Sequence, residues 1–563
     1  MPYQNYPTER YETLKALYHA VADRYGEKPL FLQKDGDAMQ SISYRRFSED
    51  VDALGTALLA RGLGGTRILI AGESSASWAT AYLAVLCGVG VAVPIDKSLS
   101  PHAVEQIAQR TQASAIICSA SVEQKLEGRL PALTRIGFSA LPDLIDEGHL
   151  LIDASDRSYL DLSPDPDAVG VILFTSGSAG KEKGVMLSHR NLCFNLSEMC
   201  KMIAINETDL FLSVLPMHHA YECTCGFLCP LSRGATVAFS RGLRHLTQDM
   251  RTFSPTVMLC VPMLLETIYE KIQANVRKLG LEKQVRSTVK LTDAIAHEGL
   301  RSAAKKKAFS EIHASFGGRL RLLISGGASV SPETLKGLRE LGFLAIQGYG
   351  LTECSPIVAL NRDSFFRDTS VGMATPNTLL DIYDPQNNGA GEIRFQGENV
   401  MLGYFEDPIE TARVLRDGWF YTGDLGYLDP DGFLYITGRK SNAITTANGR
   451  TVYPEELEAL LDRTPFVKES MVVGLEGGRK KGLDIVAVIL PDLDRMREVF
   501  GDGFTADQLD LEMRRALSDA NCAVPDYKRI KSYLLRDLPF PKNSSQKLLR
   551  HGIAEEAQKQ YRT

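Results

Sequence analysis

The sequence predicts an α/β protein with a large N-terminal domain of layered sheets and helices and a small C-terminal α+β domain. Three observations predict this class. The 563 residues are 44% hydrophobic and 23% charged, which is enough apolar material for sizeable buried cores. Short continuous apolar runs alternate with helical patterns, as in parallel sheets covered on both faces. A break at Gly438-Arg439 precedes a shorter mixed segment, so we expect domains at 1–438 and 439–563.

The predicted elements follow the chain in order. The first strands and helices alternate: we expect strands at 67–71, 89–94 and 114–118, and helices at 48–61 and 102–110. The strand pattern resumes at 169–174, 210–215, 236–239, 257–261 and 320–325. A basic helical stretch covers about 265–315, and short strands with turns cover 370–437. The remaining residues hold a few strands and amphipathic helices, which favours a small α+β domain.

Charge and cysteine content narrow the classes of function. The formal net charge is −6, whereas a nucleic-acid binder presents a basic surface, so we expect no nucleic-acid partner. The ten cysteines are scattered, which is typical of reduced thiols in a reducing compartment. The N-terminus lacks a signal-peptide pattern, and the longest apolar stretch, 83–95, is too short to cross a bilayer. We therefore expect a soluble cytoplasmic protein.

The strongest local motif is Leu173-Phe-Thr-Ser-Gly-Ser-Ala-Gly-Lys-Glu-Lys-Gly184, a buried strand that enters a loop ahead of a helix starting near Ser188. Glycines let the backbone approach an anion closely, and amides, hydroxyls and ammonium groups can then surround a phosphate. The spacing is not that of a Walker A loop, which disfavours a P-loop kinase or ATPase. The candidate phosphate-binding residues are Thr175, Ser176, Gly177, Ser178, Gly180 and Lys183.

This loop resembles the phosphate loop of the adenylate-forming superfamily, which contains acyl-CoA synthetases, adenylation domains of peptide synthetases and beetle luciferases. Five further stretches resemble motifs of that superfamily and occur in the same order. Residues 321–328 resemble the adenine-backing strand and turn, and residues 347–353 the central signature. Residues 418–424 resemble the ribose motif, residues 432–439 the interdomain hinge, and residues 541–547 the catalytic-lysine loop. The resemblance extends from about residue 30 to residue 550.

The resemblance implies that a carboxylate attacks the α-phosphate of ATP. Both reactants are anionic, so fixed cations and hydrogen-bond donors are needed to lower the barrier. Glu353 would bind Mg²⁺, Thr352 would donate to the α-phosphate, and Arg439 and Lys547 would supply positive charge. Asp424 would accept from the ribose hydroxyls. The further residues implied in ATP or AMP binding are Gly326, Gly327, Ala328, Gln347, Gly348, Tyr349 (a flat face for adenine) and Gly350.

Four positions depart from the superfamily pattern. Asn543 stands where Thr is usual, Gln546 where Gly precedes the lysine, and Glu182 where Pro is usual in the phosphate loop. In the hinge, formed by Lys440 and Ser441, the serine replaces the common Asp or Lys. We expect these departures to alter rates or domain motion rather than to abolish the chemistry.

The stretch 215–222 resembles the acyl-pocket motif of fatty acyl-CoA synthetases, with His219, Tyr221 and Glu222 as pocket residues. Ala220 lies about where amino-acid-activating relatives carry an Asp, which disfavours an α-amino substrate. The nearby cysteines do not have a common zinc spacing. The segments 265–315, 403–408 and 448–456 resemble the long-chain subgroup. The resemblance therefore favours a long-chain fatty acid–CoA ligase that uses Mg²⁺, ATP and CoA.

Several alternatives stay open at this point. The acyl group could pass to the phosphopantetheine of an acyl carrier protein, or the acid could be an aryl or short-chain acid. A non-catalytic nucleotide-binding relative is the remaining class, and the departures at Gln546 and Ser441 are its support. Lys305-Lys-Lys307 could contact anionic lipid and give weak peripheral membrane binding, although a solvated helix face is the more common reading of such a run.

Overall fold

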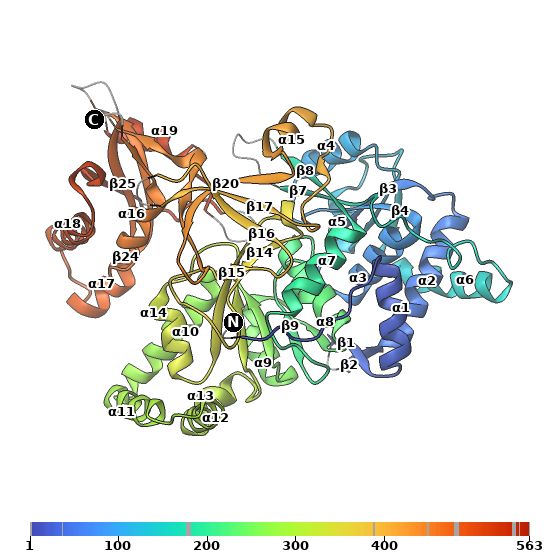
Figure 1. The fold of residues 1–563 in the computed structure, drawn as a ribbon, viewed down its shortest axis with the longest axis horizontal. Helices are drawn as coiled ribbons and strands as arrows, with labels where there is room; N and C mark the ends of the chain where they lie inside the picture. The colour runs from blue at the N-terminus through green and yellow to red at the C-terminus, as the bar shows by residue number, and fades with distance from the viewer. Residues whose placement is uncertain are drawn as a thin grey trace. The chain divides into compact units, whose positions relative to one another are not determined.

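The computed structural model describes residues 3–36, 38–175, 182–386, 389–446, 450–477, 483–542, 548–550 and 552–561 (Figure 1). Its described residues form two compact units. The first contains residues up to 379 together with 395–420, and the second contains 380–394 and residues from 421 onward. Residues 421–438 thus group with the second unit, ahead of the predicted boundary. That the chain pivots at 439 stays a prediction.

A nine-stranded sheet forms one half of the first unit. In sheet order its strands are β15 (Met373–Ala374), β14 (Ile357–Leu360), β13 (Leu344–Gly350), β12 (Leu322–Ser325), β11 (Val257–Cys260), β9 (Leu210–Ser213), β10 (Thr236–Phe239), β1 (Pro29–Asp35) and β2 (Ala38–Ser43). The strands from β13 to β1 are parallel, and the outer ones are antiparallel. Their apolar runs match strands that are buried on both faces.

A seven-stranded sheet forms the other half. Its strands, in order, are β18 (Gly403–Tyr404), β8 (Lys183–Ser188), β7 (Val169–Thr175), β4 (Gly90–Pro94), β3 (Thr66–Ala71), β5 (Ala115–Cys118) and β6 (Thr134–Gly137). The predicted strands at 67–71, 89–94 and 114–118 are confirmed. Strand β8 was not predicted: it pairs antiparallel with β7 and precedes the helix, which begins after the N-cap Ser188 as expected.

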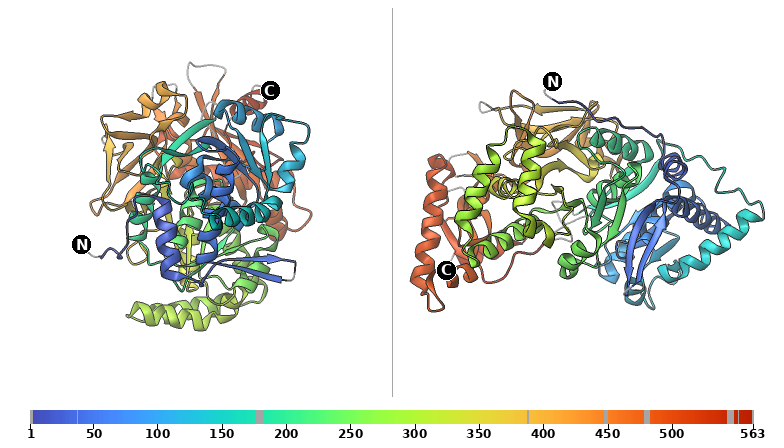
Figure 2. Two further views of the ribbon diagram at one scale, coloured as in Figure 1. Left: turned by 90° about the vertical axis from the view of Figure 1, so that its right-hand side faces the viewer. Right: turned by 90° about the horizontal axis from the view of Figure 1, so that it is seen from below.

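Helices cover both sheets, and α1, α2 and α6 pack side by side (Figure 2). The predicted helical stretch at 265–315 is confirmed as α10–α13. The α-helices of this unit are α1 (Leu14–Tyr25), α2 (Tyr44–Ala60), α3 (Ala76–Ala84), α4 (Pro101–Thr111), α5 (Ala120–Lys125), α6 (Leu141–Asp153), α7 (His189–Cys200), α8 (Cys229–Ser232), α9 (Leu246–Phe253), α10 (Pro262–Lys278), α11 (Glu282–Asp293), α12 (Glu298–Ala308), α13 (Ser310–Ser315), α14 (Pro332–Glu340) and α15 (Pro408–Val414). Shorter helical turns are η1 (Val85–Val89), η2 (Phe138–Ala140), η3 (Glu222–Leu228), η4 (Leu243–His245) and η5 (Thr352–Cys354).

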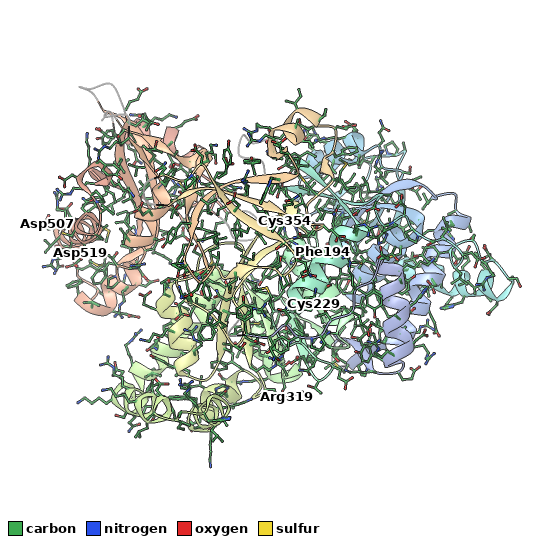
Figure 3. The ribbon with its side chains drawn as sticks, viewed as in Figure 1. Phe194, Cys229, Arg319, Cys354, Asp507 and Asp519 are labelled. Carbon is green, nitrogen blue, oxygen red and sulfur yellow. The ribbon has the colours of Figure 1, made fainter. Side chains whose placement is uncertain are left out.

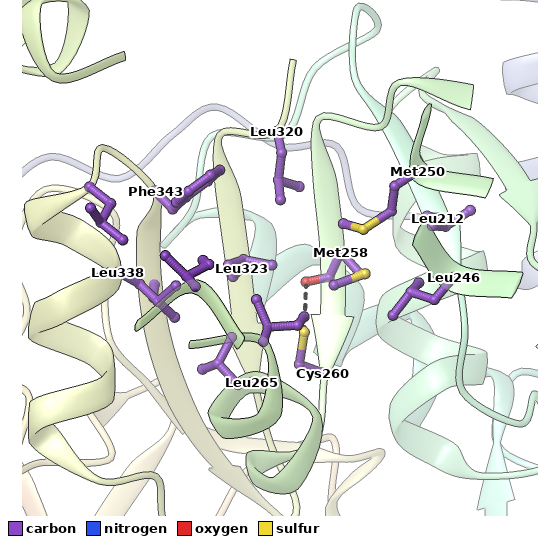
Figure 4. Close-up of a cluster of buried hydrophobic side chains, with 14 of the residues drawn as sticks. Leu212, Leu246, Met250, Met258, Cys260, Leu265, Leu320, Leu323, Leu338 and Phe343 are labelled. Atoms are coloured by element: carbon purple, nitrogen blue, oxygen red, sulfur yellow. Dashed lines mark hydrogen bonds between the residues drawn. The ribbon is translucent and has the colours of Figure 1, made fainter. Parts of the chain in front are cut away.

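The nine-stranded sheet packs against α9, α10 and α14 through a large apolar core (Figure 4). Met258 and Leu323 extend from neighbouring strands, and Met250, Leu265 and Leu338 extend from the three helices. All five side chains are buried. Burial on this scale fixes the strand order, and hence the places where β12 and β13 end.

The second unit is built on two sheets. The first is a five-stranded sheet with strands β16 (Leu379–Tyr383), β17 (Gly391–Gln396), β20 (Trp419–Leu428), β19 (Leu415–Arg416) and β21 (Leu434–Arg439), of which β19 falls within residues 395–420. The second has β24 (Val467–Glu476), β25 (Leu483–Pro491) and β26 (Ser532–Leu535), beside the short pair β22 (Ile444–Thr445) and β23 (Thr451–Val452). The helical elements are α16 (Pro454–Leu461), α17 (Leu493–Phe500), α18 (Ala506–Cys522), α19 (Ile553–Tyr561), η6 (Lys440–Asn442) and η7 (Asp526–Lys528).

The three-stranded sheet of this unit is buried on both faces. Val472 packs in a core with α16 and α18, whereas its neighbours Met471 and Val473 pack on the other face with α19. This alternation has the period of two expected for a strand. The predicted α+β character of the C-terminal part is confirmed.

The structure bears on two expectations from the sequence, which concern lipid contact by the lysine run at 305–307 and membrane-spanning helices. Lys305 is buried, forms an ion pair with Asp293 at 2.7 Å and donates to the carbonyl of Arg339, so it is neither a lipid ligand nor part of a solvated face. Within the described part of the chain, no helix is both long and apolar enough to span a bilayer.

Candidate active site

The phosphate-loop motif spans a β-hairpin. Thr175, the last residue of β7, pairs with Lys183, the first residue of β8. Ser176, Gly177, Ser178 and Gly180 lie outside the described residues, so their predicted role is untested. The Lys183 ammonium is paired at 2.5 Å with Glu410 of α15 and lies 4.9 Å from the ring centre of Tyr404. The structure thus gives this lysine a carboxylate and an aromatic face as neighbours.

The predicted adenine-backing turn lies at the end of β12. Parallel pairing of Ser325 with Gln347 places the turn Gly326-Gly327-Ala328 beside the β13 end that carries the central signature. Gly327 has φ +91°, a conformation that favours glycine. A Cβ on Gly326 would lie 3.0 Å from the ring of Tyr221, so this turn and the predicted acyl-pocket motif are in contact.

The side chain of Gln347 is occupied within the chain. It is buried, accepts from the amide of Val330 at 3.1 Å and donates to the carbonyls of Asp368 and Ser370. Gln347 therefore fixes the segment that follows the glycine turn. Its predicted contact with nucleotide stays a prediction.

The two glycines of the central signature lie in close strand packing. A Cβ on Gly350 would lie 2.1 Å from the carbonyl oxygen of Pro356, and a Cβ on Gly348 would lie 2.8 Å from Leu360. The Pro356 contact is with backbone and leaves no room for a side chain, whereas the Leu360 contact is with the end of a flexible side chain that can shift. Tyr349, between them, is buried. The antiparallel pairing of β13 with β14 thus depends on Gly350, whatever ligand the strand end binds.

Glu353 lies in the short turn η5, directly after Thr352. The hydroxyl of Tyr404 donates to Glu353 Oε1 at 2.8 Å. Glu353 is partly buried and Tyr404 is buried. The ring of Tyr404 also lies against Lys183. A single carboxylate with one oxygen oriented by a hydroxyl fits a Mg²⁺ ion that takes its other ligands from phosphates and water. Among the described residues, no cluster of three or more His, Cys, Asp or Glu side chains is arranged to hold a metal.

Sequence reasoning missed Tyr404. It lies in β18, which pairs with β8 and so brings it next to the end of the phosphate-loop hairpin. The stretch 403–408 was noted for its resemblance to the long-chain subgroup, without a role for the tyrosine. A hydroxyl's contact with a carboxylate 51 residues away is not readable from spacing.

The predicted acyl-pocket residues lie in and just before the π-helical turn η3. Tyr221 donates to the carbonyl of Ile324 at 2.9 Å. Glu222 is 1% exposed and accepts from the Ser213 hydroxyl at 2.5 Å. Burial raises the pKa of Glu222 to about 8, so the carboxyl is protonated at neutral pH.

The two histidines ahead of this turn are also uncharged at neutral pH. Burial lowers the pKa of His219, and burial together with the neighbouring His219 lowers the pKa of His218 to about 3. The segment 218–222 therefore has no formal charge near pH 7, although it contains two histidines and a glutamate.

In the second unit, the predicted ribose and hinge motifs face one another across a strand pair. Asp424 of β20 pairs in register with Arg439 of β21, and their side chains form an ion pair at 3.1 Å. Lys440 pairs with Glu392 at 3.0 Å, and Ser441 donates to Asn442. These contacts place four predicted residues in one region of one unit.

The remaining predicted catalytic residue, Lys547, lies outside the described residues, together with Asn543 and Gln546. Glu182 is described: burial raises the pKa of its carboxyl, and its carbonyl accepts from Arg110 at 2.8 Å. The departure at this position therefore leaves the backbone next to the loop anchored to α4.

Comparison with known proteins identifies the class. The model of the AMP-binding enzyme family matches residues 18–405, more than half of the chain, so the chain belongs to this family. It is an adenylate-forming ligase. The mouse long-chain-fatty-acid–CoA ligase 5 is 30% identical over 507 residues, covering 82% of this chain and 73% of its own. The long-chain-fatty-acid–CoA ligase FadD15 of Mycobacterium bovis is 28% identical and covers 90% and 89%.

Solved structures show the same fold over nearly the whole chain. The ATP-bound MatB from Rhodopseudomonas palustris has a TM-score of 0.77 at 23% identity and covers 97% of this chain and 99% of its own. The anthranilate CoA ligase AuaEII, in complex with anthranoyl-AMP, has a TM-score of 0.76 at 19% identity and covers 99% of both chains. At these identities the likeness establishes the fold alone. The predicted fold class and family are confirmed.

Proposed function

We propose that the protein activates a fatty acid with MgATP to an acyl-adenylate and then transfers the acyl group to CoA, with release of pyrophosphate and AMP. The observation that carries this proposal is the absence of formal charge near pH 7 in the segment 218–222, the predicted acyl-pocket motif. Glu222 is buried and protonated, and its neighbouring histidines are neutral. A pocket lined by this segment would suit an apolar acyl chain and would give an α-ammonium group no carboxylate to pair with.

The chain's own residues supply the positioning that the first step needs. Glu353 would hold Mg²⁺ through the oxygen that Tyr404 leaves available, and Thr352 follows the strand end where a phosphate would lie. The bound cation would neutralise phosphate charge. Lys183 adds a cation beside the same tyrosine. In the second unit, Asp424 would accept from the ribose hydroxyls, oriented by Arg439.

Long-chain relatives support the choice of a fatty acid and of CoA. Two of them, named above, are long-chain-fatty-acid–CoA ligases and align over more than 80% of this chain. A ligase for an aryl acid shares the fold, so the aryl alternative is decided by experiment. The test is pyrophosphate release with MgATP and a ladder of acids from acetate to palmitate plus benzoate, with and without CoA.

We expect release to peak with long-chain acids and to turn over only with CoA. A peak with benzoate would instead establish an aryl-acid ligase. Acid-dependent pyrophosphate release that needs an acyl carrier protein would show that the carrier protein, and not CoA, accepts the acyl group. No release with any acid would support the non-catalytic alternative. Substituting Lys547→Ala should abolish adenylation yet spare thioester formation from supplied acyl-adenylate, and unchanged adenylation would remove this lysine from the mechanism.

A further inference from the structure

Two buried cysteines of the first unit lie in sulfur contact. Cys200 is the last residue of α7, and Cys229 is the first residue of α8. Their Sγ atoms are 3.5 Å apart, and both side chains are 3% exposed. Figure 3 labels Cys229 well inside the first unit. A disulfide needs a sulfur separation of about 2.05 Å, so the two atoms must close by roughly 1.5 Å.

A cavity connects one member of this pair with the solvent. The cavity has a volume of about 450 Å³ and is lined by Cys200, by its helix neighbour Cys193 and by Arg233. Its lining also includes Glu9 and Arg24, whose side chains are about half exposed. A molecule as small as hydrogen peroxide can therefore reach Cys200, whereas Cys229 is absent from the lining.

Of the two thiols, Cys200 is the one whose surroundings lower the pKa. The pKa of Cys200 is lowered by its hydrogen bond with Cys229, against burial, which raises it, and is lowered further by the nearby guanidinium of Arg233. The pKa of Cys229 is raised by the same hydrogen bond and by burial. The thiolate is the form of cysteine that attacks a peroxide. Arg233 is held in place because it donates to the carbonyls of Ile205 and Pro7.

We propose that Cys200 and Cys229 form a reversible disulfide when the protein meets a peroxide. The Cys200 thiolate attacks hydrogen peroxide, the O–O bond breaks, and Cys200 becomes a sulfenic acid as hydroxide leaves. The Cys229 thiol then attacks the sulfenic sulfur, the S–S bond forms and water leaves. In sum, two thiols lose two electrons and two protons, and one peroxide becomes two waters. A dithiol reverses the bond by exchange.

The bond would join the end of α7 to the start of α8. Helix α8 continues directly from η3, which carries Glu222, so the disulfide would fix the predicted acyl-pocket motif against α7. This consequence rests on the proposed function. The bond itself does not, and it is measured without any activity assay.

The experiment uses the full-length protein with Cys522→Ser, because Cys522 is the exposed cysteine and would couple chains together. The protein is treated with hydrogen peroxide, denatured in an alkylating agent and mapped by non-reducing mass spectrometry. We expect peptides joined through Cys200 and Cys229, and two fewer alkylated thiols per chain. Dithiothreitol should restore both thiols.

Two variants in the same background test the partner. With C229A, Cys200 should be trapped as a sulfenic acid by a dimedone probe. Cys225→Ala is the matched control, because Cys225 Sγ faces Met199 Sδ at 3.7 Å, and it should keep the bond. Thermal unfolding confirms that each variant is folded. The proposal is wrong if, after peroxide treatment of the Cys522→Ser protein, Cys200 and Cys229 can both still be alkylated. It is also wrong if Cys200 pairs with Cys225.

Discussion

Two glutamates of the first unit, Glu222 and Glu353, have opposite surroundings. Glu222 is fully enclosed, its neighbour is the Ser213 hydroxyl, and burial raises its pKa to about 8. Glu353 is only partly buried and accepts from the hydroxyl of Tyr404, whose ring lies against the ammonium of Lys183. The same side chain is thus a buried, uncharged group in one place and a candidate ligand for a cation in the other.

This difference shows that residue type alone does not assign a role in the site. Both glutamates lie in motifs that resemble those of adenylate-forming enzymes, at 215–222 and 347–353. Their surroundings separate them. Desolvation at Glu222 favours the neutral acid, whereas the hydroxyl donor and partly open position of Glu353 suit a carboxylate. The predictions below test each side of this contrast.

The largest expected effect concerns the pH dependence of stability. Between pH 5 and pH 8 folded Glu222 keeps its proton, whereas the unfolded side chain has lost it, so the free energy of unfolding should fall as pH rises. Three pH units at 1.36 kcal/mol each give roughly 4 kcal/mol. Glu222→Gln removes this contribution. In urea unfolding, the free energy of unfolding of the variant minus that of the natural protein should therefore increase from pH 5 to pH 8.

The control for that measurement is Glu147→Gln. The surface carboxylate of Glu147 is paired with Arg61, which lowers its pKa, so its titration lies below this window. The control should therefore keep the pH slope of the natural protein between pH 5 and pH 8. A natural protein whose slope equals that of Glu222→Gln would show that Glu222 is ionised when folded.

Glu353→Gln tests the charged side of the contrast. Loss of one fixed group that stabilises transition-state charge typically costs about 10²–10³-fold in kcat, or about 3–4 kcal/mol. We expect this loss in pyrophosphate release at saturating ATP and acid, with a raised requirement for Mg²⁺. The exposed variant Glu147→Gln should keep full activity. An unchanged Mg²⁺ dependence in Glu353→Gln would remove Glu353 from cation binding.

The sequence predicted the fold and the strand ends well, because both depend on local apolar runs. Thr175, the turn at 326–328 and the signature at 347–353 all lie at or next to strand ends, where spacing is informative. The antiparallel strand β8 was missed because its six residues follow the glycine-rich loop and read as part of it.

Side-chain partners from distant segments could not be predicted. Tyr404 meets Glu353 only because β18 adds to the edge of the sheet beside β8, and Ser213 meets Glu222 only because β9 lies next to η3. Likewise, Gln347 sits in the signature motif, yet its amide hydrogens are used by backbone carbonyls. Such contacts depend on tertiary packing rather than on any periodicity in the sequence.

Tyr404→Phe tests whether the hydroxyl orients Glu353. The phenyl ring keeps the packing under Lys183, and only the hydrogen bond to the carboxylate is lost. Loss of a group that orients a metal ligand typically costs 10–100-fold, and we expect the lower end, about 10-fold, because Glu353 itself stays in place. The Mg²⁺ concentration for half-maximal rate should rise, which a purely structural role would not cause. An unaltered Mg²⁺ titration would contradict the positioning role of Tyr404.

The smallest effect is expected at Glu410, which holds Lys183 in a partly buried ion pair at 2.5 Å. If Lys183 serves ATP phosphates, Glu410 competes with them, and such a pair contributes about 1 kcal/mol. Glu410→Gln should then lower the KM for ATP about fivefold at low salt and less at high salt. Lys183→Met should raise the KM in the same assay. A higher KM in Glu410→Gln would instead show that the carboxylate holds Lys183 in its working position, which would make this ion pair part of the phosphate site rather than its competitor.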